Sequence, residues 1–364
     1  MNRSVRPLAV LVKAVVIFVG LNILYGLLDP VLSLSTYNIL APGRIRFPFK
    51  TNSYSVMVDD LDVMFASHRI AAENPPDEFR VMLVGDSSVW GEELPASDSI
   101  SELWNAGGEK CGGQNLVFYN LSYPHPSVIK DLVIMERSTR YAPDLFIWFV
   151  TANSLMPRRI NPFVIANREE FLQLLDTYDL SMADEDILRD AKLTFYDKTI
   201  IGRRSLIARW IKLQALGMVW SATGAEFHEG EFGELPLPPN DLHEDLKYLG
   251  KDPRQNLAKI LSLDIVTAGY QIADSTPLLI VNEPISIATG LNSGARYNNV
   301  YPRWAYDQYR AAMDEAAGKF GWRYADLWNI IPQAYFSNEF HLTAEGEQLL
   351  VEKISPILQA NFCR

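Results

Sequence analysis

The sequence lacks the patterns by which most proteins bind metals, nucleotides or nucleic acids. It has no CxxC or HExxH pattern and no glycine-rich phosphate loop, and its five histidines do not cluster along the chain. No stretch interleaves basic with aromatic residues, and the formal net charge of −11 is the opposite of what a nucleic-acid surface needs. We therefore expect no metal, no cofactor and no nucleic-acid partner.

Internal repeats and long low-complexity tracts are also lacking. Of the 364 residues, 48% are apolar and 21% are charged, which supplies enough apolar material for one large core or two modest ones. The acidic side chains are spread along the chain, as on an ordinary solvated surface. This composition excludes disordered and fibrous proteins.

Cysteine is scarce, with only Cys111 and Cys363 in the chain. Cys111 precedes a predicted strand and Cys363 follows the last predicted helix, so both should lie at the amino edge of a parallel sheet. A disulfide between them is one interpretation, and two unrelated thiols are the other. A disulfide would require an oxidising compartment.

Long apolar runs are limited to one, at the N-terminus. From Leu8 to Leu28 the chain is apolar apart from one lysine, one asparagine and two glycines, which is long enough to cross a hydrocarbon core of roughly 30 Å. Arg3, Arg6 and Lys13 lie at its start, so the positive-inside rule places the N-terminus in the cytoplasm. We expect a single-pass anchor in the cell membrane, with everything after residue 30 extracytoplasmic.

Two alternatives to an anchor remain open. A cleavable signal peptide also has a basic start and an apolar middle, but Leu27 to Val31 offers no convincing small-x-small cleavage site. A soluble core helix would normally show a polar face, which this run lacks. We favour the anchor.

Beyond the anchor, predicted strands and helices alternate as in an α/β protein with a mostly parallel, five-stranded sheet. The expected strands are Arg80 to Val84, Leu116 to Asn120, Leu145 to Val150, Leu278 to Val281 and Trp322 to Leu327. The expected helices are Ser127 to Arg140, Pro253 to Gln271, Trp304 to Phe320 and Thr343 to Ala360.

This pattern divides the chain into three parts. Residues 1–30 hold the cytoplasmic start and the anchor, residues 31–78 a juxtamembrane connector, and residues 79–364 the α/β domain. An insertion at about 155–250 interrupts the domain after the third strand, and should lie at the carboxyl edge as a lid or a wall of the substrate groove. Its apolar stripe could instead touch the membrane, although such helices more often pack on their own domain: Leu206, Ile207, Trp210, Ile211, Leu213 and Leu216.

The strongest motif joins the first strand to the end of the chain. Gly85-Asp86-Ser87 follows the first strand directly, and such a turn presents a serine oxygen at the edge of the sheet where α/β proteins bind ligands. Asn338-Glu339-Phe340-His341 precedes the last helix and supplies a base that could take the serine proton. The pair predicts a serine hydrolase or acyltransferase, although Ser87 could also be a simple helix cap.

These segments resemble the four sequence blocks of the SGNH, or GDSL, hydrolases. The blocks are Gly85-Asp86-Ser87, Asn120 with the loop after it, Asn153 and His341, and the resemblance covers about Phe79 to Gln359 without the insertion. The family implies a flavodoxin-like three-layer α/β/α fold. Its members are esterases, lipases, polysaccharide acetylesterases and O-acyltransferases.

The resemblance also implies a role for each block. Ser87 would be the nucleophile and, through its backbone N–H, the first oxyanion donor, with Asn153 as a side-chain donor and His341 as the general base. His125 lies at or near the position where the family has a glycine whose backbone N–H completes the oxyanion hole. The third block reads Thr151-Ala152-Asn153-Ser154 rather than Gly-x-Asn-Asp, so it keeps only the asparagine.

One departure affects the third member of the catalytic set. Asn338 stands three residues before the histidine, where a carboxylate would normally orient the imidazole. An amide oxygen can accept the imidazole N–H, but it carries no charge to stabilise an imidazolium. Glu283, at the end of the fourth strand, is the alternative acid.

Two functional hypotheses follow. The first is a membrane-anchored extracytoplasmic serine esterase or O-acyltransferase that acts on acyl esters of cell-envelope glycans or lipids; by resemblance, its partner could be a membrane-bound O-acyltransferase. The second is a catalytically inert SGNH-like binding or scaffolding subunit of a membrane assembly. His125 and Asn338 are the residues that favour the second.

Overall fold

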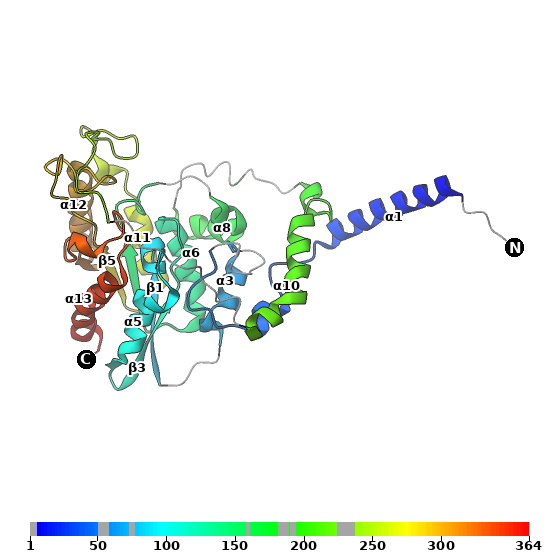
Figure 1. Cartoon of the computed structure of the whole chain (residues 1–364), viewed down its shortest axis with the longest axis horizontal. Helices are drawn as coiled ribbons and strands as arrows, with labels where there is room; N and C mark the ends of the chain where they lie inside the picture. Colours follow the sequence, from blue (N-terminus) through cyan, green and yellow to red (C-terminus); the bar gives the residue numbers. More distant parts are fainter. Residues whose placement is uncertain are drawn as a thin grey trace.

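The computed structural model describes residues 6–49, 58–72, 77–157, 161–180, 189, 194–223 and 237–363. A long N-terminal helix, α1 (Pro7–Leu28), leads away from an α/β body that holds the rest of the described chain (Figure 1). It begins at Pro7, because proline suits the first turn of a helix, and ends at Asp29 in a left-handed conformation.

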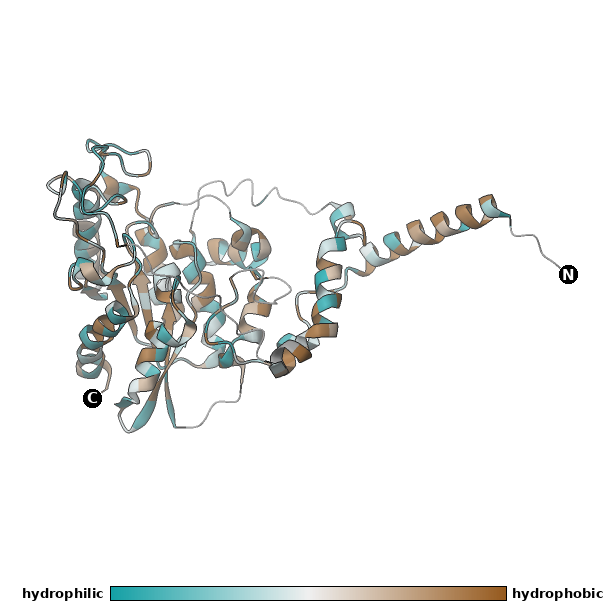
Figure 2. Cartoon of the chain, viewed as in Figure 1, coloured by the Kyte–Doolittle hydropathy of each residue, from teal (hydrophilic) through white to brown (hydrophobic). Residues whose placement is uncertain are grey.

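Helix α1 is exposed along most of its length, and it is apolar on all sides, as its largely brown ribbon in Figure 2 indicates. It is long and apolar enough to cross a membrane. A signal sequence would have the same length and composition, so the fold leaves both the expected anchor and the signal peptide open.

The sheet has six strands in the order β2-β3-β1-β4-β5-β6. Their bounds are β1 Glu78–Val84, β2 Lys110–Cys111, β3 Gln114–Asn120, β4 Leu145–Val150, β5 Leu278–Asn282 and β6 Arg323–Asp326. The five strands expected from the sequence all pair in parallel. The short strand β2 pairs antiparallel with β3, so the sheet is mixed and six-stranded, which corrects the expected five-stranded sheet.

The extra strand follows from two glycines. Gly112 and Gly113 connect β2 to β3 and both have positive φ, 57° and 93°, the conformation that closes tight hairpins. Cys111 in β2 forms a disulfide with Cys363 at the end of the chain. The bond therefore joins the edge of the sheet to the last helix.

Helices cover both faces of the sheet. Helices α6 (Val128–Ser138), α11 (Leu263–Ala273) and α12 (Arg303–Phe320) share one buried cluster with Met82, Val84 and other strand residues. Helices α5 (Ile100–Gly107) and α13 (Ala344–Phe362) share the second cluster with Val81 and Leu83. Because successive strand residues point to opposite faces, the sheet is buried on both sides and the body has three layers.

Two segments differ from the expected organisation. Helix α11 begins at Leu263 rather than Pro253, and residues 253–262 form turns and a short 3-10 helix instead. Much of the expected connector is part of the body: α3 (Leu61–Ser67) is buried in the main core, and Arg46 donates to the carbonyl oxygens of Trp90, Gly91 and Leu94. The described part of the connector also contains α2 (Thr36–Leu40) and the 3-10 helix η2 (Arg69–Ala71).

The insertion contains three described α-helices and one 3-10 helix. They are α7 (Pro162–Ala166), α8 (Arg168–Tyr178), η5 (Phe195–Lys198) and α10 (Arg204–Thr223). Helices α7 and α8 pack on the main core, whereas η5 and α10 lie beside the start of the chain. Figure 1 shows α10 between the body and the end of α1. The insertion therefore has two structural roles: α7 and α8 extend the main core, and η5 and α10 contact the N-terminal segment.

Candidate active site

Ser87 and His341 meet above the carboxyl end of β1. The side-chain oxygen of Ser87 lies 2.8 Å from Nε2 of His341. Strand β1 has β3 on one side and β4 on the other, so the strand order reverses here, which is where open α/β sheets leave a crevice for ligands. The nucleophile and base expected from the sequence are thus within hydrogen-bond reach.

The turn before Ser87 needs a glycine for steric reasons. A Cβ at Gly85 would lie 3.0 Å from Val89 and 3.2 Å from Phe149, so the strand can approach its own helix, α4 (Ser87–Trp90), only without a side chain there. Asp86 caps α4 by accepting from the backbone N–H of Ser88. This close packing holds Ser87 at the first position of the helix.

A fully buried lysine, Lys130, connects the two loops that border the site. Nζ of Lys130 donates to the carbonyl oxygens of Gly85 and Tyr123, at 2.7 and 2.6 Å, and pairs with Asp131 at 2.7 Å. One ammonium group therefore ties the nucleophile turn to the loop after β3, and an ammonium without water needs such partners. Burial raises the pKa of Asp131 to about 6, while the charge of Lys130 opposes that rise. In the sequence, its only sign is a lysine inside an apolar helix pattern.

Asn153 and His125 line the same cavity as Ser87 and His341, with a volume of about 370 Å³. The hydroxyl of Tyr248 donates to Oδ1 of Asn153 at 2.8 Å. Because the amide oxygen accepts this bond, Nδ2 is the donor side of the amide. Tyr248 is buried and comes from the end of the insertion, so the insertion helps to orient an expected oxyanion donor.

The backbone of His125 adopts a conformation that is typical of glycine. Its φ is 88°, in the left-handed region that favours glycine, and it stands where the resemblance implies a glycine. Its ring packs against Phe49, with ring centroids 5.5 Å apart. A side chain in this conformation costs on the order of 1–2 kcal/mol, and such strain gathers at functional sites. His125 therefore holds a side chain at a backbone conformation that a glycine would adopt without strain.

Asn338 contacts the other nitrogen of His341, but through its NH₂ group. Its Oδ1 accepts from the backbone N–H groups of Phe340 and His341, at 3.1 and 2.9 Å, which fixes the orientation of the amide. Nδ2 therefore faces Nδ1 of His341, at 2.8 Å. An amide NH₂ can only donate, so Nδ1 accepts here and the proton of the neutral imidazole lies on Nε2.

Two glutamates that the sequence analysis missed lie near the imidazole. Oε2 of Glu93 is 3.9 Å from Nδ1 of His341, and Oε2 of Glu92 is 3.9 Å from Nε2. Glu93 also accepts from Ser337 Oγ at 2.7 Å and lies 3.4 Å from Nδ2 of Asn338. Its φ of 70° turns the chain after α4 back toward the histidine. The only sequence signal was a pair of acids a few residues after the serine.

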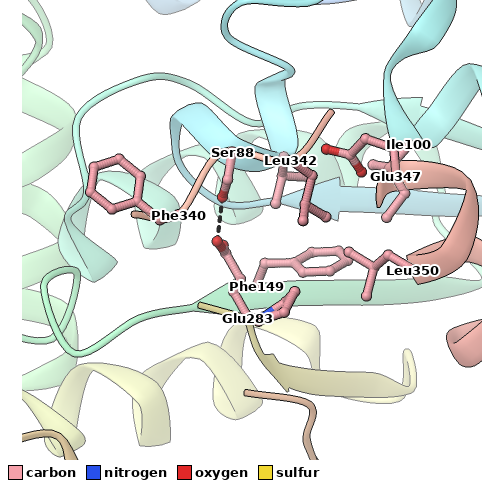
Figure 3. Close-up of a pocket in the computed structure, with 10 residues that line it drawn as sticks. Ser88, Ile100, Phe149, Glu283, Phe340, Leu342, Glu347 and Leu350 are labelled. Atoms are coloured by element: carbon pink, nitrogen blue, oxygen red, sulfur yellow. Dashed lines mark hydrogen bonds between the residues drawn. The ribbon is translucent and has the colours of Figure 1, made fainter. Parts of the chain in front are cut away.

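Glu283, the alternative acid expected from the sequence, has a different partner from His341. Its carboxyl group accepts from the hydroxyl of Ser88 (Figure 3), and the residue also lines the cavity of Ser87 and His341. Burial, and then the charge of Asp86, raises the pKa of Glu283 well above its ordinary value. A raised pKa favours the protonated carboxyl group, which supplies less negative charge to a histidine than a carboxylate does.

A second buried acid lies beside Glu283. Glu347, from the first turn of α13, lines the same small cavity of about 10 Å³ as Glu283 and Ser88 (Figure 3). Burial raises the pKa of Glu347 to about 8. In the part of the chain that the structure describes, no group of three or more His, Cys, Asp or Glu side chains is arranged to hold a metal ion.

Comparison with known proteins gives structural likenesses only. No family model matches the chain, and no curated protein matches it. The chain is similar to a member of the lipolytic protein G-D-S-L family from Veillonella parvula, with 12% identity and a TM-score of 0.36 over 77% of this chain and 98% of the other. The chain is also similar to a carbohydrate acetylesterase family member from Sinorhizobium meliloti, with 11% identity and a TM-score of 0.34. This likeness covers 77% of this chain and 97% of the other.

A third solved structure is similar to the same degree. It is an active-site mutant of a family two carbohydrate esterase from Clostridium thermocellum, with 8% identity and a TM-score of 0.35 over 80% of this chain and 66% of the other. Because these TM-scores lie below 0.5, we base the assignments below on the residues and distances of this chain.

Proposed function

We propose that the chain is a membrane-anchored, extracytoplasmic serine esterase or O-acyltransferase of the SGNH type. Its substrates would be acyl esters of cell-envelope glycans or lipids. The observation that carries the proposal is the 2.8 Å contact between Ser87 Oγ and His341 Nε2, in a cavity that Asn153 also lines. A serine, a base and an amide donor around one cavity are the parts that acyl transfer requires.

In the proposed mechanism, Ser87 Oγ attacks the carbonyl carbon of the ester while Nε2 of His341 takes the hydroxyl proton. The resulting oxyanion accepts from the backbone N–H groups of Ser87 and His125 and from Nδ2 of Asn153. The C–O bond to the alcohol then breaks, and the alcohol leaves with the proton from His341. Water, or a hydroxyl group of a second sugar, next attacks the acyl-enzyme and restores the serine.

We propose that Glu93 supplies the negative charge that Asn338 does not carry. His341 can accept the serine proton only when its own proton is on Nδ1, and that nitrogen then needs an acceptor. Oε2 of Glu93 lies 3.9 Å away and Nδ2 of Asn338 is a donor, so Glu93 is the group that can accept a hydrogen bond from this N–H. A carboxylate there would also stabilise the imidazolium that forms during attack.

The tautomer favours a second candidate function. In the described arrangement Nδ1 accepts from Asn338, so Nε2 carries the proton and points it at Ser87. A histidine in this state does not activate a serine, and an inert binding or scaffolding module would tolerate it. The two candidates differ in whether Glu93 can displace Asn338 from Nδ1.

Fluorophosphonate labelling of the intact chain in detergent distinguishes the candidates. The esterase proposal expects covalent capture of Ser87 and hydrolysis of a fluorogenic acetyl ester, both lost in Ser87→Ala. Ser97→Ala is the matched control, because Ser97 is exposed ten residues further along. Absence of labelling in a folded sample would overturn the enzyme and favour the inert module.

The acceptor and the partner are separate parts of the proposal. Adding a soluble sugar acceptor to the ester assay separates transfer, which yields an acylated sugar, from hydrolysis, which yields only the free acid. A membrane-bound O-acyltransferase as acyl donor rests on the family resemblance alone. Co-purification of such a protein with the intact chain is its test.

A further inference from the structure

The end of α1 is held by the insertion through polar contacts. Asn22, a polar residue within the apolar helix, is buried, and its Oδ1 accepts from the backbone N–H of Ile201 at 3.1 Å. Asp29, directly after the helix, pairs with Lys198 and Arg203, each at 2.6 Å. These contacts fix the segment that includes η5 and the start of α10 beside the last two turns of α1.

Apolar packing reinforces the same junction. The ring of Phe195 covers Gly26, where an added Cβ would lie 2.9 Å from the ring. Phe195 is nevertheless 47% exposed, and its neighbour Tyr196 is 54% exposed. Tyrosine is enriched at the two surfaces of a membrane, and phenylalanine is common on the apolar side of segments that lie in the interface.

Helix α10 uses only one side to pack on its own chain. Leu213 and Gly217 are buried against Tyr37 of α2, and a Cβ at Gly217 would lie 2.6 Å from that ring. The indole N–H of Trp210 donates to the carbonyl oxygen of Leu34 at 3.2 Å. This side of α10 therefore covers the chain that follows α1.

The opposite side of α10 is apolar and exposed. Its residues recur every three or four positions, as one side of a helix requires: Ile211, Ala215, Met218 and Ala222, with Val219 beside them. Ile211 is 56% exposed, Met218 52% and Val219 56%. On α2, the apolar side chains of Ile39 and Leu40 are also exposed, at 59% and 64%. A helix of a soluble body would normally carry polar residues there.

The length of α1 predicts how deep these residues would lie relative to a membrane that α1 spans. Its 22 residues rise about 1.5 Å each, so the helix just spans a hydrocarbon core of roughly 30 Å. Residues packed on its last two turns therefore lie at the outer membrane surface. Figure 1 shows α10 running across the end of α1 rather than along it, which is the direction of the membrane plane if α1 spans.

We propose that Phe195 to Ile201, α10 and α2, together called the platform, lie in the outer interface of the bilayer. The exposed side of α10 would be in the acyl chains, and its basic residues Arg204, Arg209 and Lys212 would meet anionic headgroups. This inference rests on the proposed anchor. It adds that the α/β body contacts the lipid surface directly through the platform, rather than being connected to the membrane by α1 alone.

Depth-dependent fluorescence quenching tests the platform. Single cysteines are introduced into the intact chain, whose native cysteines are already bonded to each other, and labelled with an environment-sensitive dye. The positions are Met218→Cys in the platform, Val16→Cys in α1 and Lys353→Cys at an exposed position of α13. The labelled proteins are reconstituted into vesicles of phosphatidylcholine and phosphatidylglycerol that contain a nitroxide-labelled lipid.

We expect nitroxide lipid to remove about half or more of the fluorescence at Met218→Cys and Val16→Cys, and almost none at Lys353→Cys. If Val16→Cys is quenched and Met218→Cys matches Lys353→Cys, the platform is wrong and the anchor stands. If Val16→Cys is not quenched, the anchor itself is wrong. Ile211→Cys, on the same side of α10, repeats the measurement if Met218→Cys does not fold.

A second copy of the chain is the competing occupant of the exposed side. It would shield Met218→Cys from nitroxide lipid and make its emission depend on the ratio of protein to lipid. That result would overturn the platform. Vesicles without phosphatidylglycerol supply the charge test, because weaker quenching there would support the assignment of the basic residues to anionic headgroups.

Discussion

Asn338 donates an amide hydrogen to Nδ1 of His341 across 2.8 Å. The contact keeps the position of the usual acid-to-histidine bond and reverses its direction. The imidazole is therefore oriented toward Ser87 while its proton is on the nitrogen that should accept from the serine. This relationship governs the first two predictions.

Replacing Asn338 by aspartate should raise activity. In Asn338→Asp, one carboxylate oxygen can still accept the two backbone N–H groups while the other accepts from Nδ1, which restores the productive tautomer. In serine proteases the reverse change costs about 10⁴ in turnover. With Glu93 repelling the new charge, we expect a gain of about 10- to 100-fold in kcat on an acetyl ester. Asn338→Ala should give no gain, and equal rates in all three proteins would contradict the prediction.

Removing the charge of Glu93 should slow the wild-type enzyme. Two unit charges about 4 Å apart interact by roughly 4 kcal/mol at an effective dielectric constant of 20, and solvent reduces this toward about 1 kcal/mol at a part-exposed glutamate. We therefore expect kcat to fall about tenfold in Glu93→Gln, with little change in KM. Glu352→Gln, at an exposed position of α13, is the control and should leave kcat unchanged. A KM effect alone would mean that Glu93 binds substrate instead.

Tyr248 should affect turnover through Asn153. Tyr248→Phe keeps the buried ring and removes the hydroxyl that holds Oδ1, so Nδ2 is oriented less well toward the oxyanion. A complete oxyanion donor is worth about 10²–10³ in kcat, and we expect loss of its orientation to cost about tenfold. Steady-state kinetics on the acetyl ester measure it. Tyr270→Phe, at a remote and partly buried tyrosine, should leave kcat unchanged, and an equal loss there would indicate a general packing defect.

The stability of the fold should fall as the pH rises. Burial raises the pKa of Glu347 from 4.5 to about 8 in the folded chain, so the folded state holds this proton more tightly than the unfolded state. Its contribution is complete below about pH 4.5 and is lost as the pH rises through about 8. Each unit of pKa difference corresponds to about 1.4 kcal/mol.

Glutamine at position 347 should remove this dependence, because it has the same shape and does not ionise. We expect the unfolding free energy of Glu347→Gln, from urea titrations of the intact chain in detergent, to fall less steeply than that of the wild type over this range. Some slope should remain, since the pKa values of Glu283 and Asp131 are also raised. Parallel curves for the two proteins would show that Glu347 does not titrate in this window.

The sequence predicted those parts of the site that follow directly after strands. Ser87 and Asn153 come just after β1 and β4, so placing the strands also places these side chains at one edge of the sheet. His341 precedes a helix with a clear apolar pattern. For such residues local pattern and parallel topology are sufficient.

The residues that support the site were not predictable in the same way. Tyr248 reaches Asn153 from 95 positions away, and no periodic pattern marks such a contact. Glu93 approaches the histidine because its backbone adopts a φ of 70°, which single sequences do not reveal for a glutamate. Glu283 was placed correctly at a strand end, but its partner depends on which way one side chain turns in a buried space. Strand β2 has only two residues and no pattern of its own.

The bond between Cys111 and Cys363 spans 252 positions of the chain. Ser87 lies before this loop and His341 lies inside it, near its far end. One proteolytic cut anywhere between Gly112 and Phe340 would therefore leave two fragments, one with the nucleophile and one with the base, still joined covalently. A nicked molecule would migrate as one species on a non-reducing gel and as two after reduction, and it could keep both halves of its site through the damage.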